Sequence, residues 1–424
     1  MKQAVLALLF LFALSTLAIR DLLAPLHVAE DASHRIEGEY LVLFNDALTR
    51  PLFETQVAAL QAALEAAADG SKLNRTFTLG DKFRVLHVNL SPKSLTAVRA
   101  HPSVVLVEEN QAVHIDQACA SQNDAIWNLA RIDEHDIDLV DDDYKYSHAG
   151  EGVDVYIIDS GILTTHVEFG HRAQWGANFV DDGIDTDCYG HGTHVAGTVA
   201  GELYGVAKNT TVIAVKVLGC LGIGSWAGMI EGISWTANQA QKRGRPSVAN
   251  MSVGGSKSAI ANSAIAAAVD AGVTFVVSAG NENSDACRRS PASEPLAITV
   301  AATTIVSSSS GASQDRRTSF SNFGKCVDIA APGELIKAAW IDQDGFAPNT
   351  LFNTISGTSM ASPHVAGVAA LVLSKYPKYT PAEVETALYK VATEGVIDLA
   401  CSGLWESVRV ECLGTPNKLL YTSC

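Results

Sequence analysis

Cysteine is absent from the first 118 residues of the chain, whereas all eight cysteines lie in the residues that follow. An even number of cysteines suggests disulfide pairs if the chain enters an oxidising compartment. Buried free thiols or a zinc site are the alternatives, but no C-x-x-C spacing is present to hold a metal ion. This distribution is what an exported, disulfide-bonded domain behind a disposable leader would show.

Long hydrophobic runs are also missing, with one exception near the N-terminus. Lys2 precedes an apolar run over residues 4–14, which ends in small residues that include Thr16 and Ala18. The run is shorter than the about 20 apolar residues that a membrane span needs, and the small residues suit signal peptidase. We therefore predict that residues 1–18 are a removed signal peptide rather than a buried helix, and that the product is secreted, with no membrane partner.

Positive charge is scarce as well. The chain has 30 Lys and Arg residues against 46 Asp and Glu residues, which gives a formal net charge of −16. A nucleic-acid partner would need a basic face, so the composition argues against this class of partner. The acidic excess mainly favours solubility.

Residues 19–117 have the pattern of a small folded domain rather than a linker. Apolar runs predict strands at residues 40–44, 83–90 and 104–107, and other stretches predict helices at residues 52–68 and 94–100. The order strand, helix, strand, helix, strand predicts an α+β unit with its helices on one face of a sheet.

The sequence changes in character near residue 150. Apolar runs alternate there with helical stretches rich in glycine and alanine, and we expect strands at residues 153–158, 212–218, 248–253, 274–278, 297–301 and 327–330. Strands without polar alternation are buried on both faces, which is typical of a parallel sheet covered by helices. In such sheets, functional residues gather at the carboxyl ends of the strands.

Three polar residues occur where such a site would form. Asp159 ends an apolar run, His191 follows Gly190 in GHGTHVAGTVAG, and Ser359 begins an apolar helix in SGTSMASPHVAG. Taken singly, they fit a turn former, a surface histidine and a helix N-cap. Taken together, they supply a nucleophile, a base to accept its proton and a carboxylate to orient the base.

The chain order Asp, His, Ser is that of subtilisin, and the sequence resembles the subtilase family, specifically its proteinase K-like branch. The motifs that carry the resemblance are VDVYIIDSGI, GHGTHVAGT, YGVAKN, MSVGG, VSAGNEN, SPASEP, SFSNFG and SGTSMASPHVAG, in family order. For residues 118–424 the resemblance implies an α/β, subtilisin-like fold, with a parallel sheet flanked by helices. Residues 19–117 are similar to the family's inhibitory propeptide, which implies a small α+β, ferredoxin-like unit.

The resemblance also implies roles for individual residues. Asp159, His191 and Ser359 would form the catalytic triad, and the Asn281 side chain would line the oxyanion hole, where negative charge builds up on the carbonyl oxygen. An extended substrate would add as a β-strand between two segments, which are Gly222, Ile223, Gly224, Ser225 and Ser252, Val253, Gly254. The pocket for the P1 residue would be walled by the second segment together with Ser278, Ala279 and Gly280. Since no charged residue stands at its base, apolar and aromatic P1 residues are expected.

A structural calcium site is implied in the same way, with no cofactor for catalysis. The carbonyl groups of Pro295 and Ala297 and the carboxylate of Asp328 would bind the ion, and such oxygens suit a hard cation. His194 and His364 stand among small apolar residues in predicted helices, and we interpret both as structural.

The disulfide prediction rests on chain position and on the same resemblance. Cys188–Cys220 would tie two loops that flank the active site. Cys287 follows the oxyanion segment and Cys326 precedes the predicted strand that carries Asp328, and their spacings resemble pairs in bacterial proteinase K-like enzymes, which implies Cys287–Cys326. Of the remaining four residues, Cys401 and Cys412 are close in sequence, which leaves Cys119 and Cys424 to join the termini.

Together these observations predict a secreted, monomeric serine endopeptidase that acts on proteins and peptides with broad specificity. Its propeptide would serve as inhibitor and folding aid and would be removed autocatalytically, so that the peptidase domain begins near residue 118. The alternative is a catalytically silent secreted binding protein that retains the fold. Whether Asn209, in a glycosylation sequon, carries a glycan is left open by the sequence.

Overall fold

The computed structural model describes residues 23–29, 35–80, 82–111, 119–307, 313–342, 349–401, 410–412 and 414–422. The chain divides into two compact units, Met1–Asp116 and Gln117–Cys424, which are described separately. The predicted signal peptide, residues 1–18, and the junction of the two units, residues 112–118, lie outside the described residues.

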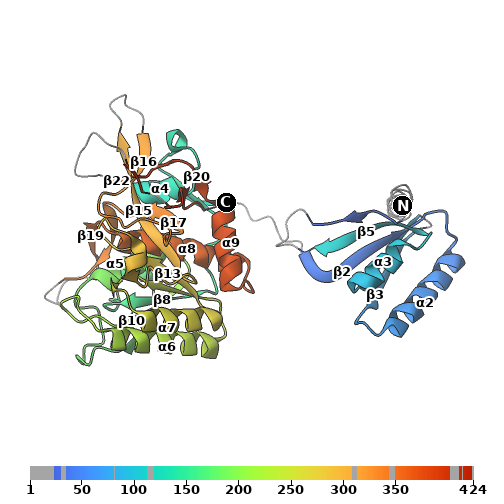
Figure 1. The fold of residues 1–424 in the computed structure, drawn as a ribbon, viewed down its shortest axis with the longest axis horizontal. Helices are drawn as coiled ribbons and strands as arrows, with labels where there is room; N and C mark the ends of the chain where they lie inside the picture. The colour runs from blue at the N-terminus through green and yellow to red at the C-terminus, as the bar shows by residue number, and fades with distance from the viewer. Residues whose placement is uncertain are drawn as a thin grey trace, which may run out of the picture. The chain divides into compact units, whose positions relative to one another are not determined.

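The N-terminal unit is a sheet with two helices packed on one face (Figure 1). Its strand order is β1-β5-β2-β4-β3. Val42 of β2, Leu86 of β4, Phe53 of α2 and Val98 of α3 share one apolar core. The elements are β1 Leu26–His27, β2 Arg35–Phe44, α2 Arg50–Ala67, β3 Lys72–Leu79, β4 Phe83–Asn89, α3 Pro92–Arg99 and β5 Val104–Gln111.

The predicted order of this unit is incomplete, because β1 and β3 were not expected. The strand β3 lies at the edge of the sheet, and most of its residues are exposed. It therefore lacks the apolar run that marks a buried strand, and its place is fixed by pairing with β4, as in the register Phe77↔Val85.

The C-terminal unit is built on a sheet whose central strands are all parallel. Their order is β17-β15-β13-β11-β8-β10-β9. The strands are β8 Asp154–Asp159, β9 Ala173–Asn178, β10 Thr211–Lys216, β11 Ser247–Met251, β13 Thr274–Ser278, β15 Ile298–Ser307 and β17 Ile329–Pro332. This arrangement confirms the predicted parallel sheet.

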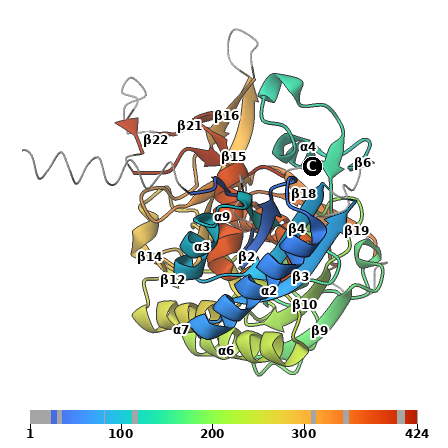
Figure 2. The ribbon, with the colours of Figure 1, turned by 90° about the vertical axis from the view of Figure 1, so that its right-hand side faces the viewer.

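Helices cover both faces of this sheet. On one face, Val155 and Ile157 of β8 share a core with residues of α5 (His191–Ala200) and α8 (Thr358–Lys375). On the other face, Tyr156 and Ile158 share a core with residues of α6 (Trp226–Arg243) and α7 (Ala259–Asp270). Figures 1 and 2 show α6 and α7 side by side below the sheet. A strand buried on both faces is apolar throughout, which is why periodicity of two is absent from these runs.

Each of the six predicted apolar runs overlaps a strand, although β9 was not expected. The strand β9, AQWGAN, is only half-buried, and it contains Gly176. A side chain at Gly176 would come within 2.5 Å of the carbonyl oxygen of Ala214 on the neighbouring strand. The expected placement of Asp328 within a strand is wrong, since β17 begins at Ile329.

Two disulfide bonds join loops of the C-terminal unit. The predicted Cys188–Cys220 and Cys287–Cys326 bonds are both present. Cys119 and Cys412 are also disulfide-bonded. Their pairing with Cys424 and Cys401 stays a prediction, because residue 424 and the side chain of residue 401 lie outside the described residues.

No helix within the described residues is long and apolar enough to cross a membrane.

Candidate active site

The carboxyl edge of the parallel sheet brings the predicted catalytic residues together. Asp159 is the last residue of β8, which lies between β10 and β11. His191 is the first residue of α5 and Ser359 is the second residue of α8. His191 bonds to Asp159 at the end of β8, and Ser359 bonds to Ser252 just beyond the neighbouring strand β11, so both helices begin at the carboxyl edge of the sheet.

Asp159 and His191 form a directly bonded pair. The Nδ1–H of His191 donates to Oδ1 of Asp159 over 2.8 Å, and the N–H of Ser160 donates to the same oxygen over 2.8 Å. Burial lowers the pKa of His191, but the charge of Asp159 and its hydrogen bond raise it, and the net shift is upward. The bond at Nδ1 leaves Nε2 as the ring atom that accepts a proton.

Pro363 leaves the main-chain carbonyl group of Ser359 without its usual helical hydrogen bond. Pro363 has no N–H, so the carbonyl oxygen of Ser359, four residues earlier, has no helical donor. Ser252 Oγ fills this role and donates to Ser359 O over 2.9 Å. In return, Ser359 Oγ donates to the carbonyl oxygen of Ser252 over 3.0 Å. The hydroxyl group therefore points to Ser252, and no hydrogen bond joins it to His191 among the described residues.

Asn281 and Ser359 present two N–H groups to one small space. Oδ1 of Asn281 accepts from both N and Oγ1 of Thr358, each over 2.8 Å, which fixes the orientation of the amide. A methyl group added to Gly357 would lie 3.4 Å from Asn281 Nδ2 and 3.6 Å from Ser359 N. The two donors thus border the same space, and Ser359 N also lies at a helix N-terminus, which favours negative charge.

The two predicted substrate segments lie on either side of Asp159. The first, Gly222, Ile223, Gly224 and Ser225, follows β10, and the second, Ser252, Val253 and Gly254, follows β11. Because β8 lies between β10 and β11, the two segments follow the strands on either side of Asp159. Ser278 ends β13, the neighbour of β11, so Ser278, Ala279 and Gly280 lie next to the second segment.

Comparison with known protein families identifies the family of the chain. The family described as Subtilase family matches residues 150–403 of the chain. The chain belongs to the subtilase family.

Individual relatives of this subtilase are serine proteinases. It is 40% identical over 413 residues to the extracellular serine proteinase of Thermus sp. (strain Rt41A), covering 94% of this chain and 92% of the relative. It is 45% identical over 338 residues to the alkaline serine exoprotease A of Vibrio alginolyticus, covering 79% of this chain and 58% of the relative. It is also similar to a crystal structure of a cold adapted subtilisin-like serine proteinase, with a TM-score of 0.62 and 45% identity over 71% of this chain and 100% of the other. These similarities confirm the predicted α/β fold and the family of serine proteases.

We predict that the pH dependence of this subtilase follows His191, because a histidine that acts as general base must be neutral to accept a proton. The pKa of His191 is raised from 6.5 by Asp159 against the effect of burial, so kcat/KM should fall with a midpoint above 6.5 as the pH is lowered. In Asp159→Asn that midpoint should move to lower pH, together with a loss of kcat. Profiles of kcat/KM from about pH 5 to pH 9 measure both, and a midpoint unaffected by the substitution would contradict the assignment.

His194 and His364 of this subtilase have the contacts of structural residues. Nε2 of His194 lies 3.0 Å from the carbonyl oxygen of Ile336, and Nε2 of His364 lies 2.7 Å from Nδ2 of Asn128. Burial lowers the pKa of His194 to about 3 and that of His364 to about 4, so both rings are neutral at pH 7. Among the described residues, neither ring forms a hydrogen bond with Asp159, His191, Asn281 or Ser359.

One supporting residue was missed by the sequence analysis. Asp187 is buried, and its carboxylate accepts hydrogen bonds from Ser160 Oγ, Gly190 N and Thr193 N, over 2.8 to 2.9 Å. It thereby joins the turn after Asp159 to the first turn of the helix that carries His191. An acidic residue shortly before a helix start is an ordinary capping signal, and this signal was available in the sequence.

The carboxylate of Asp182 lies close to the sulfur atoms of Cys188 and Cys220. These sulfur atoms are bonded to each other, so they offer no thiolate ligand to a metal ion.

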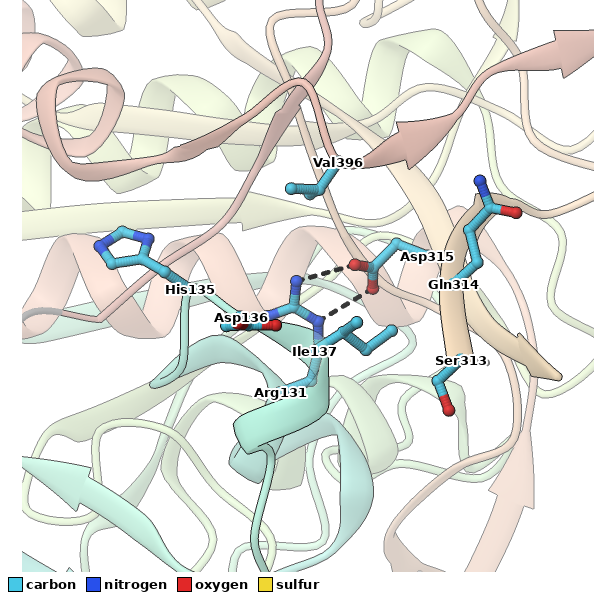
Figure 3. Close-up of a pocket in the computed structure, with 8 residues that line it drawn as sticks. All are labelled: Arg131, His135, Asp136, Ile137, Ser313, Gln314, Asp315 and Val396. Atoms are coloured by element: carbon cyan, nitrogen blue, oxygen red, sulfur yellow. Dashed lines mark hydrogen bonds and ion pairs between the residues drawn. The ribbon is translucent and has the colours of Figure 1, made fainter. Parts of the chain in front are cut away.

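The structure also contains a pocket of about 400 Å³, whose lining residues are drawn in Figure 3. Within it, the guanidinium group of Arg131 donates to the carboxylate of Asp315 through hydrogen bonds of 3.0 Å and 2.7 Å. The pocket is lined by Arg131, His135, Asp136, Ile137, Ser313, Gln314, Asp315 and Val396. None of the predicted catalytic or substrate-binding residues belongs to this set.

Proposed function

We propose that the chain is a secreted serine endopeptidase in which Ser359 is the nucleophile, His191 the general base and Asp159 the orienting carboxylate. The observation that carries the proposal is the 2.8 Å bond between His191 Nδ1 and Asp159 Oδ1, at the sheet edge where α8 presents Ser359. This arrangement would provide the nucleophile, the base that accepts its proton and the carboxylate that orients the base, which acyl transfer requires.

The reaction follows from these positions. His191 Nε2 takes the proton of Ser359 Oγ while that oxygen bonds to the scissile carbonyl carbon. The carbonyl oxygen becomes an oxyanion, which accepts hydrogen bonds from Asn281 Nδ2 and Ser359 N. His191 then gives its proton to the leaving amine, and the acyl-enzyme is hydrolysed by water through the reverse roles. When Ser359 Oγ leaves Ser252 O, that carbonyl oxygen becomes available to an N–H group of the substrate.

Substrate recognition is proposed to act mainly on the peptide main chain. The segment Gly222, Ile223, Gly224 and Ser225 is mostly exposed and offers main-chain groups at a sheet edge. The proposed P1 pocket, walled by Ser252, Val253, Gly254, Ser278, Ala279 and Gly280, contains no charged side chain. Broad specificity with a preference for apolar or aromatic P1 residues is therefore expected.

The N-terminal unit is proposed to act as inhibitor and folding aid. Its sheet has helices on one face, and on the other face Phe77, Val85, Leu43 and Leu106 form a row across four strands through their pairing registers. Phe77 is 41% exposed and its neighbour Leu79 is 75% exposed. The row is therefore exposed at its β3 end, whereas Val85 within it is buried. Exposed apolar side chains of this kind are typical of a protein interaction surface, which supports a role in binding the peptidase unit.

The alternative function, a catalytically silent binding protein, is tested by active-site labelling. A fluorophosphonate probe should label Ser359 of the processed protein, and peptides with phenylalanine at P1 should be hydrolysed faster than peptides with lysine at P1. Labelling should disappear in Ser359→Ala and be strongly reduced in His191→Ala. A fully processed protein that neither reacts with the probe nor cleaves either peptide would favour the binding protein.

A structural calcium ion is proposed near Asp328. Burial raises the pKa of Asp328 to about 7, and Oδ2 accepts one hydrogen bond, from Thr299 N over 2.8 Å. No ion pair among the described residues compensates this carboxylate. Pro295 and Ala297 precede β15, and Asp328 precedes the paired strand β17. A partly buried carboxylate that has no ion-pair partner among the described residues fits a hard cation, and the carbonyl groups of Pro295 and Ala297 are proposed as the other ligands.

Calcium should therefore stabilise the folded peptidase by mass action. Chelation should lower the melting temperature of the wild type, while Asp328→Asn should respond little. In chelator the variant should be at least as stable as the wild type, because the substitution removes an uncompensated buried charge. Thermal melts with and without chelator measure this, on chains inactivated by the fluorophosphonate. Equal calcium responses of the two proteins would remove Asp328 from the site.

A further inference from the structure

Asn322 takes no part in the mechanism above, although its side chain is fully buried, at 0% exposure. It lies in the motif SFSNFG, between β16 (Ser313–Arg317) and β17. Burying an amide group costs free energy unless its donors and its acceptor are paired. The partners of the Asn322 amide therefore indicate which part of the molecule it holds in place.

The donors of Asn322 bind the loop that carries Asn281. Its main-chain N–H donates to Gly280 O over 2.9 Å. Its side-chain Nδ2 donates to Ala279 O over 2.9 Å and to Oε2 of Glu282 over 2.7 Å. Two of these bonds fix the main chain directly before Asn281.

The acceptor of Asn322 binds the same loop beyond Asn281. Oδ1 accepts from Glu282 N over 3.1 Å, and from N and Oγ of Ser284 over 2.9 Å and 3.3 Å. One planar side chain thus holds the main chain on both sides of Asn281. Its orientation is determined, since exchange of the nitrogen and oxygen atoms would set N–H groups against N–H groups.

Gly280 leaves the space that this contact needs. Gly280 has a φ of 100°, a conformation that favours glycine. A side chain at this position would clash with Asn322 Nδ2 and would lie 2.7 Å from Glu282 Oε2. The contact between Asn322 and this loop therefore requires glycine at position 280.

The far end of the same loop is held by other groups. Phe323 N donates to Ser284 O over 3.0 Å, and Ala286 N donates to Phe323 O over 2.9 Å. The Cys287–Cys326 bond then closes the two segments covalently. These contacts keep the loop attached without Asn322, so the loss of Asn322 should act locally, at Asn281, rather than release the whole loop.

We propose that Asn322 is a positioning residue for the oxyanion hole, which holds the main chain on both sides of Asn281 so that Nδ2 meets the developing negative charge. The inference rests on the proposed role of Asn281 in catalysis. Asn322 does not touch the substrate. Its contribution is realised in the transition state, because a misplaced donor weakens the bond to the oxyanion more than it weakens substrate binding.

The test is a double-substitution cycle of Asn322→Ala and Asn281→Ala on the full chain. Each variant is processed in trans by immobilised wild-type enzyme, which is then removed. Asn322→Ala should lower kcat by about 10- to 100-fold and change KM by less than about twofold. The loss of kcat should not exceed the about 10²- to 10³-fold known for removal of such a donor in subtilisin. In the Asn281→Ala background, the same substitution should lower kcat by less than about threefold. An equal loss of kcat in the wild-type and Asn281→Ala backgrounds, or no loss of kcat in the wild-type background, would overturn the proposal.

Asn417→Ala is the matched control. Asn417 also clamps main chain, since Oδ1 accepts from Ile397 N over 3.0 Å and Nδ2 donates to Ile397 O over 2.9 Å. Its removal should lower the melting temperature and leave kcat unchanged. If Asn281→Ala itself leaves kcat unchanged, the proposed role of Asn281 fails; if it lowers kcat and Asn322→Ala does not, the inference about Asn322 alone fails.

Asn322→Asp provides a second test should the alanine variant not fold. Aspartate keeps the acceptor for Glu282 N and Ser284 N, but it sets a carboxylate against Ala279 O and Glu282 Oε2. A protonated aspartic acid restores one donor, so the ratio of variant to wild-type kcat should rise as the pH is lowered. Adding Glu282→Gln should raise that ratio at high pH by removing the like charge. A ratio of one at every pH would overturn the proposal.

Discussion

Replacing Ser359 by alanine should leave a folded chain that cannot remove its own N-terminal unit. The substitution deletes one oxygen atom in the first turn of α8, where alanine is a good helix former. The lost hydrogen bond to Ser252 O is worth about 1 kcal/mol net, so stability should change little. In subtilisin the loss of this serine lowers kcat by about 2 × 10⁶-fold, a value measured in that relative, and a loss of similar order is expected here.

The measurement is a time course of processing in a protease-free host, followed by N-terminal sequencing and peptide hydrolysis. The wild type should be cut near residues 116–120, whereas Ser359→Ala should stay at the full length of the secreted chain. Ser374→Ala, near the end of the same helix, is the matched control and should process normally. Efficient self-processing by Ser359→Ala, with retained hydrolysis of the peptide, would show that another residue is the nucleophile.

The buried parallel sheet could be predicted from the sequence because its signal is local. Strands such as β8 and β13 are buried on both faces, and a continuous apolar run is sufficient to mark them. Asp159 could be predicted for the same reason, since it ends such a run. The edge strands β3 and β9 could not, because their stability depends on pairing with a neighbour and their own residues are largely polar or half-exposed.

The contacts that support the site were not predictable from local sequence. Asn322 and Asn281 are 41 positions apart in the printed sequence, and no pattern within either motif shows that one holds the loop of the other. The bond from Ser359 Oγ to Ser252 O likewise joins two segments over a separation of 107 residues. A motif thus predicts which residues react, while the residues that orient them become visible only when the chain is folded.

Gly357→Ala should abolish most of the activity while leaving the fold intact. The added methyl group would lie 3.4 Å from Asn281 Nδ2 and 3.6 Å from Ser359 N, inside the space that both donors border. An oxyanion must approach these donors to about 2.7–3.1 Å, so the methyl group would occupy its position. Because loss of one donor costs about 10²- to 10³-fold in kcat, obstruction of both should cost at least that much.

The fold should tolerate the same methyl group. Gly357 has φ and ψ of 161°, an extended conformation that any residue adopts, and its nearest contacts are ordinary van der Waals distances. The melting temperature should therefore stay close to that of the wild type, and Thr354→Ala in the preceding strand should match it while retaining activity. Affinity for a peptide aldehyde, whose adduct carries an oxyanion, should fall in parallel with kcat. If Gly357→Ala folds and turns over substrate within a few-fold of the wild type, the oxyanion does not form beside Gly357, and the proposed pairing of Asn281 Nδ2 with Ser359 N is wrong.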